Sequence, residues 1–120
     1  MLDNLTLIRN TDKRNMLGLI YSFPDHCKEA IKIAQESTCG LRLNNIINVV
    51  ITGLGGSAIG GDLIRMLTAN SAQIPIIVNR DYTLPAFVDE RSLVIASSYS
   101  GNTEETIAAY EHAKSKRAKI

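Results

Sequence analysis

The chain has 120 residues, of which 45% are apolar, and this suits one folded domain or part of one. Its 13 Lys and Arg residues nearly balance its 12 Asp and Glu residues, which argues against a nucleic-acid-binding surface. No apolar run approaches the roughly 20 residues that a membrane span needs, and the first ten residues lack the apolar segment of a signal peptide. Cys27 and Cys39 do not have CxxC spacing, so we expect reduced thiols rather than disulfides. Together these features predict a globular cytoplasmic protein with no membrane partner.

Residues 1–40 are predicted to form a helical segment. Asp12 is suited to cap a helix in which Met16, Leu17, Ile20 and Tyr21 share one face. Pro24 is suited to the first position of a second helix, and Gly40 is the expected stop. The second helix has an apolar stripe that we expect to lie against something larger, formed by Cys27, Ala30, Ile31 and Ala34.

Residues 41–120 alternate between strand and helix patterns. Strands are expected at 46–51, 74–78 and 93–96, helical stripes at 59–67 and 106–113, an irregular connection at 79–91, and the approach to a fourth strand at 118–120. This alternation predicts an α/β fold, a three-layer αβα sandwich with a parallel sheet. Three strands and a stub make a small sheet, so either the fold is incomplete here or a partner completes it.

The first of two unusual loops, residues 53–61, holds five of the eight glycines and follows a predicted strand. Such a loop lets a ligand approach main-chain N–H groups, and packing alone explains one or two glycines rather than five. A P-loop is excluded because Asp62 follows Gly60-Gly61. The Rossmann pattern GxGxxA does fit at Gly53, but Asn79-Arg80 stand where its ribose-binding acid is expected, so dinucleotide binding remains a minority alternative.

The second loop, residues 98–103, places three hydroxyls and an amide between a predicted strand and a helix. Converging hydroxyls, main-chain N–H groups and a helix N-terminus suit a phosphate dianion. The alternative is plain helix capping, with Asn102 as N-cap and Glu105 three residues later. For phosphate binding, the carboxylates of Glu104 and Glu105 are expected to face solvent.

The remaining polar residues give no catalytic or metal site. His26 and His112 are expected to be solvated side chains, and no spacing of His, Cys or carboxylates indicates a metal. Ser100-Gly101 lacks the preceding glycine of a nucleophile elbow.

Three stretches together resemble the sugar isomerase (SIS) domain family, and within it the amino-terminal portion of the bifunctional phosphoglucose/phosphomannose isomerases. They are LDNLTLIRNTDKRNML with SFPDHCKEA, then GLGGSAIGGDL, then SSYSGNTEET. The resemblance implies that Ser98, Ser100 and Thr103 bind the phosphate of a hexose 6-phosphate. It also implies that the sugar side of the site is lined by Gly55, Gly56 and Ser57.

The resemblance further implies that residues 41–120 are the first part of a flavodoxin-like SIS domain, and that the family's second SIS domain is absent from these 120 residues. It also implies a homodimer in the full-length protein, and no metal or other cofactor. The family interconverts glucose 6-phosphate or mannose 6-phosphate with fructose 6-phosphate, and it takes its acid and base residues from later in the chain. Glu104, Glu105 and Glu111 do not match those roles, so we expect these 120 residues to bind the sugar phosphate without turnover. Two alternatives stay open: a non-catalytic SIS module that senses a sugar phosphate, and a Rossmann dinucleotide-binding domain.

Overall fold

The computed structural model describes residues 4–38, 40–41 and 43–120. By its internal contacts the chain divides into two compact units, Met1–Gly40 and Leu41–Ile120. No helix within the described ranges is both long and apolar enough to cross a bilayer.

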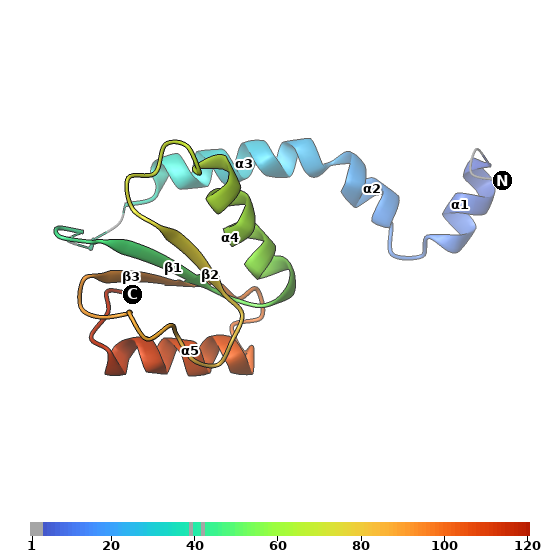
Figure 1. Ribbon diagram of the computed structural model, residues 1–120. Helices are drawn as coiled ribbons and strands as arrows, with labels where there is room; N and C mark the ends of the chain where they lie inside the picture. Colours follow the sequence, from blue (N-terminus) through green and yellow to red (C-terminus); the bar gives the residue numbers. More distant parts are fainter. Residues whose placement is uncertain (1–3, 39, 42) are drawn as a thin grey trace. The chain divides into compact units, whose positions relative to one another are not determined.

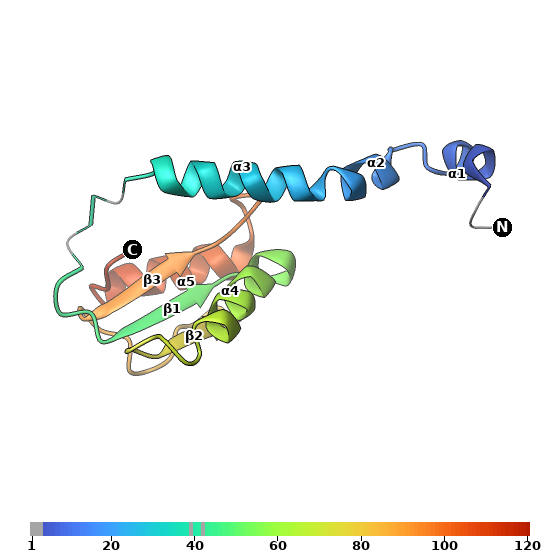
Figure 2. The same ribbon diagram turned by 90° about the horizontal axis from the view of Figure 1, so that it is seen from above.

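The first unit consists of three helices, α1 (Leu5–Thr11), α2 (Met16–Tyr21) and α3 (Phe23–Glu36). As predicted, Asp12 caps the second of them, because its carboxylate accepts hydrogen bonds from the N–H groups of Met16 at 2.7 Å and Leu17 at 2.8 Å. These bonds, the one from Leu17 first, lower the pKa of the Asp12 carboxyl. Only Ser22 separates α2 from α3, and Pro24 is the second residue of α3 rather than the first as predicted. Figure 2 shows that α2 and α3 follow one another along the chain.

The predicted stop of α3 at Gly40 is wrong. The helix ends at Glu36, and its C-cap Ser37 donates from both its N–H and its hydroxyl to the carbonyl of Ile33. A hydroxyl residue that satisfies the last-turn carbonyl removes the need for a left-handed glycine. No residue of α1, α2 or α3 is buried, including the apolar stripe of α3.

The second unit is built on three parallel strands in the order β2-β1-β3 (Figure 1). They are β1 (Asn48–Thr52), β2 (Ile76–Asn79) and β3 (Ser92–Ala96). Helix α4 (Gly55–Leu67) packs on β1 and β2, and α5 (Glu104–Ser115) packs on β1 and β3 from the other face. The predicted α/β fold, with its three layers and parallel sheet, is confirmed. The first strand begins two residues later than expected.

Residues near the C-terminus extend the sheet, as the sequence predicted. Lys119 forms an isolated parallel bridge to Leu93, in which the N–H of Val94 donates to the carbonyl of Lys119 at 2.7 Å. The bridge lies on the side of β3 away from β1. Beyond the bridge, Ile95 and Ala96 are exposed.

The core lies between the sheet and α5. It contains Val50, Val94, Ala109 and Ala113, together with Leu84 and Val88 from the irregular connection that the sequence predicted between β2 and β3. That connection is held to α5 because the N–H of Leu84 donates to Nδ1 of His112 at 3.0 Å. The prediction that His112 is a solvated side chain is therefore wrong, since the imidazole is part-buried and satisfies a backbone donor.

Candidate functional site

The two unusual loops meet at one edge of the sheet because β1 and β3 are parallel neighbours. Thr52 pairs with Ala96 at the carboxyl ends of the two strands, and the next N–H, that of Ser97, donates to the carbonyl of Thr52 at 2.8 Å. Each strand then leads into a helix, α4 after β1 and α5 after β3. Ligands of open α/β sheets bind in the crevice outside such strand ends.

The hydroxyls of Ser98, Ser100 and Thr103 form one cluster, called the hydroxyl cluster below. Ser98 Oγ lies 3.0 Å from Thr103 Oγ1, while Ser100 Oγ lies 3.3 Å from Thr103 Oγ1 and 3.4 Å from Ser98 Oγ. Only the 3.0 Å contact reaches the usual range of an O–H···O hydrogen bond. The three residues therefore converge without using up their hydroxyl protons on one another.

Main-chain N–H groups complete the hydroxyl cluster. The N–H of Gly101 donates to Ser98 Oγ at 3.1 Å, and the N–H of Asn102 donates to Ser100 Oγ at 3.2 Å. These bonds occupy acceptor positions on the two serine oxygens and leave their protons free to point elsewhere. Because each hydroxyl accepts a hydrogen bond, its own O–H is polarised into a better donor.

The alternative reading of this loop, with Asn102 as the N-cap of the helix, is wrong. The N-cap of α5 is Thr103, and it makes no side-chain capping bond. Its hydroxyl turns instead toward Ser98 and Ser100. A threonine at the N-cap ordinarily bonds an N–H of the first turn, so the loop uses this hydroxyl for the cluster rather than for the helix.

The glycine-rich segment is mostly helix rather than loop. Helix α4 begins at Gly55, so that Gly55, Gly56 and Ser57 form its first turn and the glycines at 60 and 61 lie within it. Gly55 has a φ of +52°, a conformation that side-chain-bearing residues rarely adopt. The first N–H groups of an α-helix have no partner within the helix and carry its positive dipole end.

An open hollow of about 510 Å³ joins the two loops. It brings together four of the six predicted site residues, Gly56, Ser57, Ser100 and Thr103. Gly55 and Ser98 are not on its lining, although Ser98 touches the other two hydroxyls of the cluster. The lining also includes Leu54 and Tyr99, which the sequence analysis did not select.

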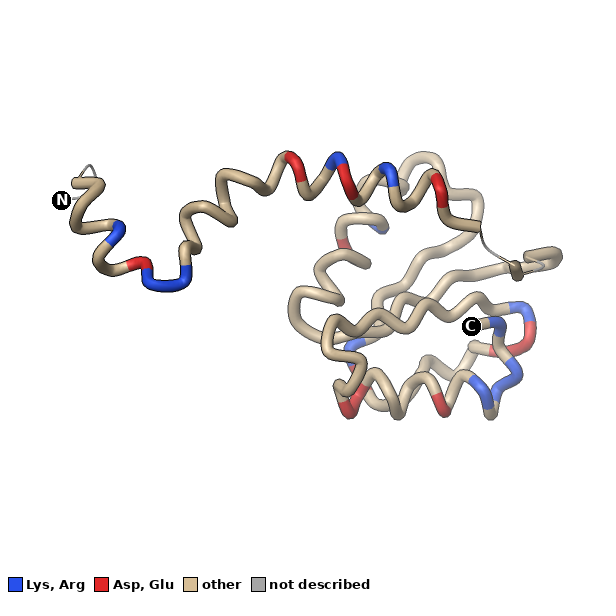
Figure 3. The backbone as a smooth tube through the Cα atoms, turned by 180° about the vertical axis from the view of Figure 1, so that it is seen from behind, with Lys and Arg blue, Asp and Glu red and all other residues tan. Residues whose placement is uncertain are grey.

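No charged side chain lines this hollow. Glu104, at the start of α5, is exposed as expected, whereas Glu105 is half-buried. Both lie close enough to Tyr82 that their negative charges, that of Glu104 first, raise the pKa of its phenol. The two carboxylates are thus associated with the connection between β2 and β3. Figure 3 shows a group of Lys and Arg residues at the opposite end of α5.

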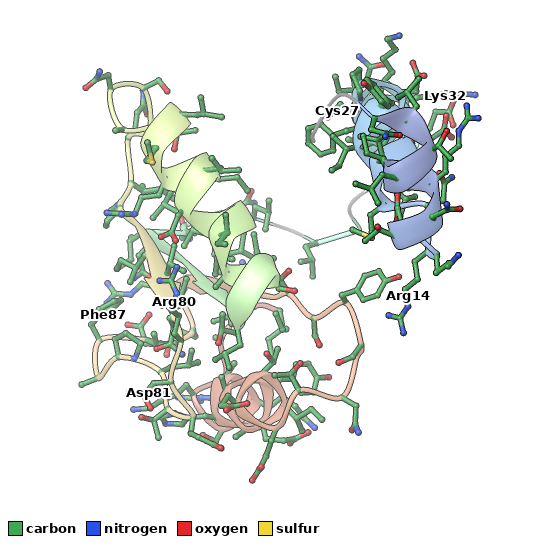
Figure 4. All side chains as sticks on the ribbon, turned by 90° about the vertical axis from the view of Figure 1, so that its right-hand side faces the viewer. Arg14, Cys27, Lys32, Arg80, Asp81 and Phe87 are labelled. Atoms are coloured by element: carbon green, nitrogen blue, oxygen red, sulfur yellow. The ribbon has the colours of Figure 1, made fainter. Side chains whose placement is uncertain are left out.

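The last residue of β2, Asn79, has an amide side chain rather than a carboxylate. The buried Asn79 side chain donates to Thr52 Oγ1 at 3.2 Å and to the carbonyl of Asp81 at 2.9 Å. The next residue, Arg80 (labelled in Figure 4), forms an ion pair with Asp62 of α4. The position at which a Rossmann domain places its ribose-binding carboxylate is therefore a buried amide.

Comparison with known proteins gives a consistent set of relatives. The bifunctional phosphoglucose/phosphomannose isomerase of Caldicellulosiruptor bescii is 53% identical over 105 residues, which cover 88% of this chain and 31% of that protein. The enzyme of the same name from Thermoplasma acidophilum is 46% identical over 79 residues, covering 66% of this chain and 24% of that protein. The chain is a homologue of the bifunctional phosphoglucose/phosphomannose isomerases. The resemblance seen in its motifs is thereby confirmed.

A more distant relative belongs to another class of sugar-phosphate enzyme. The glutamine–fructose-6-phosphate aminotransferase (isomerizing) of Pyrococcus horikoshii is 31% identical over 111 residues, covering 88% of this chain and 19% of that protein. The chain spans about a third or less of the length of these relatives. No family model and no solved structure matches it.

Metal-ligating side chains do not cluster in the described part of the chain. No group of three or more His, Cys, Asp or Glu residues that could hold a metal ion occurs among residues 4–38, 40–41 and 43–120. His26 is exposed and Cys27 is a free thiol, whereas Cys39, the other cysteine predicted to be reduced, lies outside the described residues. The two lining residues that the sequence did not predict, Leu54 and Tyr99, lie inside the quoted motifs: Tyr99 stands between Ser98 and Ser100, and Leu54 directly precedes Gly55.

Proposed function

We propose that this chain is the sugar-phosphate-binding part of an aldose–ketose isomerase that interconverts glucose 6-phosphate or mannose 6-phosphate with fructose 6-phosphate. The hydroxyl cluster is the observation that carries the proposal. It lies at the carboxyl end of β3, on the same hollow as the first turn of α4. The relatives' names, which refer to phosphoglucose, phosphomannose and fructose 6-phosphate, support the same substrate class.

The geometry suits a phosphate held by neutral donors. The cluster has three hydroxyl protons, and its one contact of ordinary length, between Ser98 and Thr103, uses one of them. Two O–H donors remain for an anion, and the positive end of the α4 dipole faces the same hollow. Donors without formal charge bind a dianion moderately, which suits a metabolite that must leave.

The same hollow lacks the groups that would carry out the reaction. Moving a proton between C1 and C2 of the sugar needs a general base, and ring opening needs an acid or base. The hollow is lined by no carboxylate, imidazole or amine. We therefore propose that the chain binds the substrate's phosphate and does not turn it over by itself.

Among the two alternatives, the Rossmann reading conflicts with the end of β2, where the buried Asn79 amide replaces the ribose-binding carboxylate. The sensor reading shares the binding site. It is less favoured because the relatives are named as enzymes.

Calorimetric titration of the 120-residue chain with fructose 6-phosphate tests the proposal. Replacing two hydroxyls together, Ser100→Ala with Thr103→Val, should weaken binding by about 1–3 kcal/mol, because only the Ser98 hydroxyl of the cluster then remains to donate to the charged group. Thr103 makes no capping bond, so its replacement leaves α5 intact. Ser71→Ala removes a hydroxyl beyond the other end of α4 and should leave binding unchanged.

Binding of NADH in place of fructose 6-phosphate would overturn the proposal, as would equal fructose 6-phosphate affinity in the double variant and the parent chain. A coupled assay for glucose 6-phosphate formation should give no rate with this chain alone. A measurable rate would refute the statement that it lacks the acid and base.

A further inference from the structure

Tyr99 is unusual within the candidate site because its side chain is entirely exposed, at 104% relative accessibility. Its neighbours on both sides belong to the hydroxyl cluster, and each accepts a main-chain hydrogen bond. The loop backbone is thus held in place while the ring extends into water. Since the ring contributes no packing to the fold, its removal should not destabilise the protein.

Tyr99 lines the same hollow as Ser100 and Thr103 of the hydroxyl cluster, and an apolar residue that precedes α4, Leu54, also lines it. Leu54 follows β1, directly before α4, and is 38% exposed. The hollow therefore combines polar groups, the hydroxyls of Ser57, Ser100 and Thr103, with two apolar side chains. Inorganic phosphate has no apolar surface that could contact these two side chains, whereas a phosphate attached to a carbon chain does.

We propose that Tyr99 covers the carbohydrate part of a bound hexose phosphate, with Leu54 providing further apolar contact, and so makes the site prefer a sugar phosphate over inorganic phosphate. This inference rests on the proposed function of the hydroxyl cluster. An aromatic ring offers a large contact area with only two side-chain torsions to fix, so little conformational entropy opposes the contact. The C–H groups on one face of a sugar would supply the matching surface.

The predicted role separates two contributions to binding. The hydroxyl cluster acts on the phosphate, which both ligands share. Tyr99 acts on the sugar, which only the hexose phosphate has. Loss of the ring should therefore change the ratio of the two affinities, an outcome that simple damage to the loop would not produce.

The test compares titrations of the 120-residue chain with fructose 6-phosphate and with inorganic phosphate. Tyr99→Ala should bind fructose 6-phosphate about fivefold to tenfold more weakly, with inorganic phosphate unchanged. Tyr99→Phe keeps the ring and should bind both ligands as the parent chain does. Phe87→Ala, which removes an exposed ring of the β2–β3 connection outside the hollow, is the matched control and should also leave both affinities unchanged.

Three results would overturn the inference without contradicting the proposal that the hydroxyl cluster binds phosphate. They are an unchanged fructose 6-phosphate affinity in Tyr99→Ala, an equal weakening of both ligands, and a parent chain that binds the two ligands equally well. A parent chain that binds neither ligand would overturn the proposed function and, with it, the role of Tyr99.

Discussion

Two adjacent glycines in α4 are expected to respond in opposite directions to the same substitution. A Cβ at Gly61 would lie 3.0 Å from Ile51 Cγ2 and 3.3 Å from Val78 Cγ2, since this face of the helix packs directly on β1 and β2. A Cβ at Gly60 would meet nothing within 4 Å, and this residue is exposed. Gly61→Ala should therefore press the helix away from the sheet, whereas Gly60→Ala should not.

The magnitude follows from two opposing effects. Alanine is favoured over glycine inside a helix by about 1 kcal/mol, and both variants gain this amount. At position 61 the contacts below ordinary van der Waals distance involve β-branched side chains of two strands, which move only with their backbone. Overpacking of this kind costs about 1–3 kcal/mol. Because both variants gain the same helix propensity, the difference between their free energies of unfolding equals the packing cost at position 61.

Thermal unfolding of the full chain, followed by circular dichroism, measures this difference. For a unit the size of residues 41–120, each kcal/mol corresponds to about 4–8 °C in Tm. Gly60→Ala should unfold at or above the parent Tm, and Gly61→Ala clearly below Gly60→Ala. Equal Tm values for the two variants would refute the close contact between α4 and the sheet.

Two further predictions concern hydrogen bonds to single side chains. His112→Ala removes the acceptor of the Leu84 N–H and should lower the free energy of unfolding, measured by urea titration, by about 1–3 kcal/mol. The control His26→Ala, at an exposed position, should change this free energy little. Equal effects of the two variants would contradict the hydrogen bond between Leu84 and His112. Asp12 has a pKa below its ordinary value of 3.8, so its stabilisation of α2 is present above that pH and is lost as the pH falls through the lowered pKa. Asp12→Asn should abolish this acid-range change in the amide NMR shifts of the first turn of α2, and persistence of the change in the variant would exclude Asp12 as its source.

The local pattern predicted where elements lie better than where they begin. The apolar stripe from Ile59 onward correctly indicated a helix, but the glycines before it have low helix propensity, so the segment from Gly55 was assigned to a loop. Packing overrides propensity there, because the glycine at 61 allows the close approach of α4 to Ile51 and Val78. The stop expected at Gly40 failed for a similar reason, since Ser37 already satisfies the last turn of α3.

In the candidate site, too, the sequence predicted some features and the fold decided others. The composition of residues 98–103 marked Ser98, Ser100 and Thr103 as the favoured phosphate ligands, but it also allowed the alternative that Asn102 caps the helix. Only the fold shows that Thr103 is the N-cap and that its hydroxyl faces the two serines. Tyr99 and Leu54 were missed because an apolar residue in a polar motif carries no chemical signal until its exposure is known.

The sequence by itself determined the order and type of the elements in residues 41–120, the two loops with unusual composition and the relationship to the phosphoglucose/phosphomannose isomerases, because all of these depend on residues close together in the chain. The tertiary structure decided the strand order β2-β1-β3, which makes β1 and β3 neighbours and brings their two loops to one hollow. It also decided that His112 holds the β2–β3 connection. These features depend on contacts between residues far apart in the chain, and periodicity and spacing contain no information about which distant segments meet.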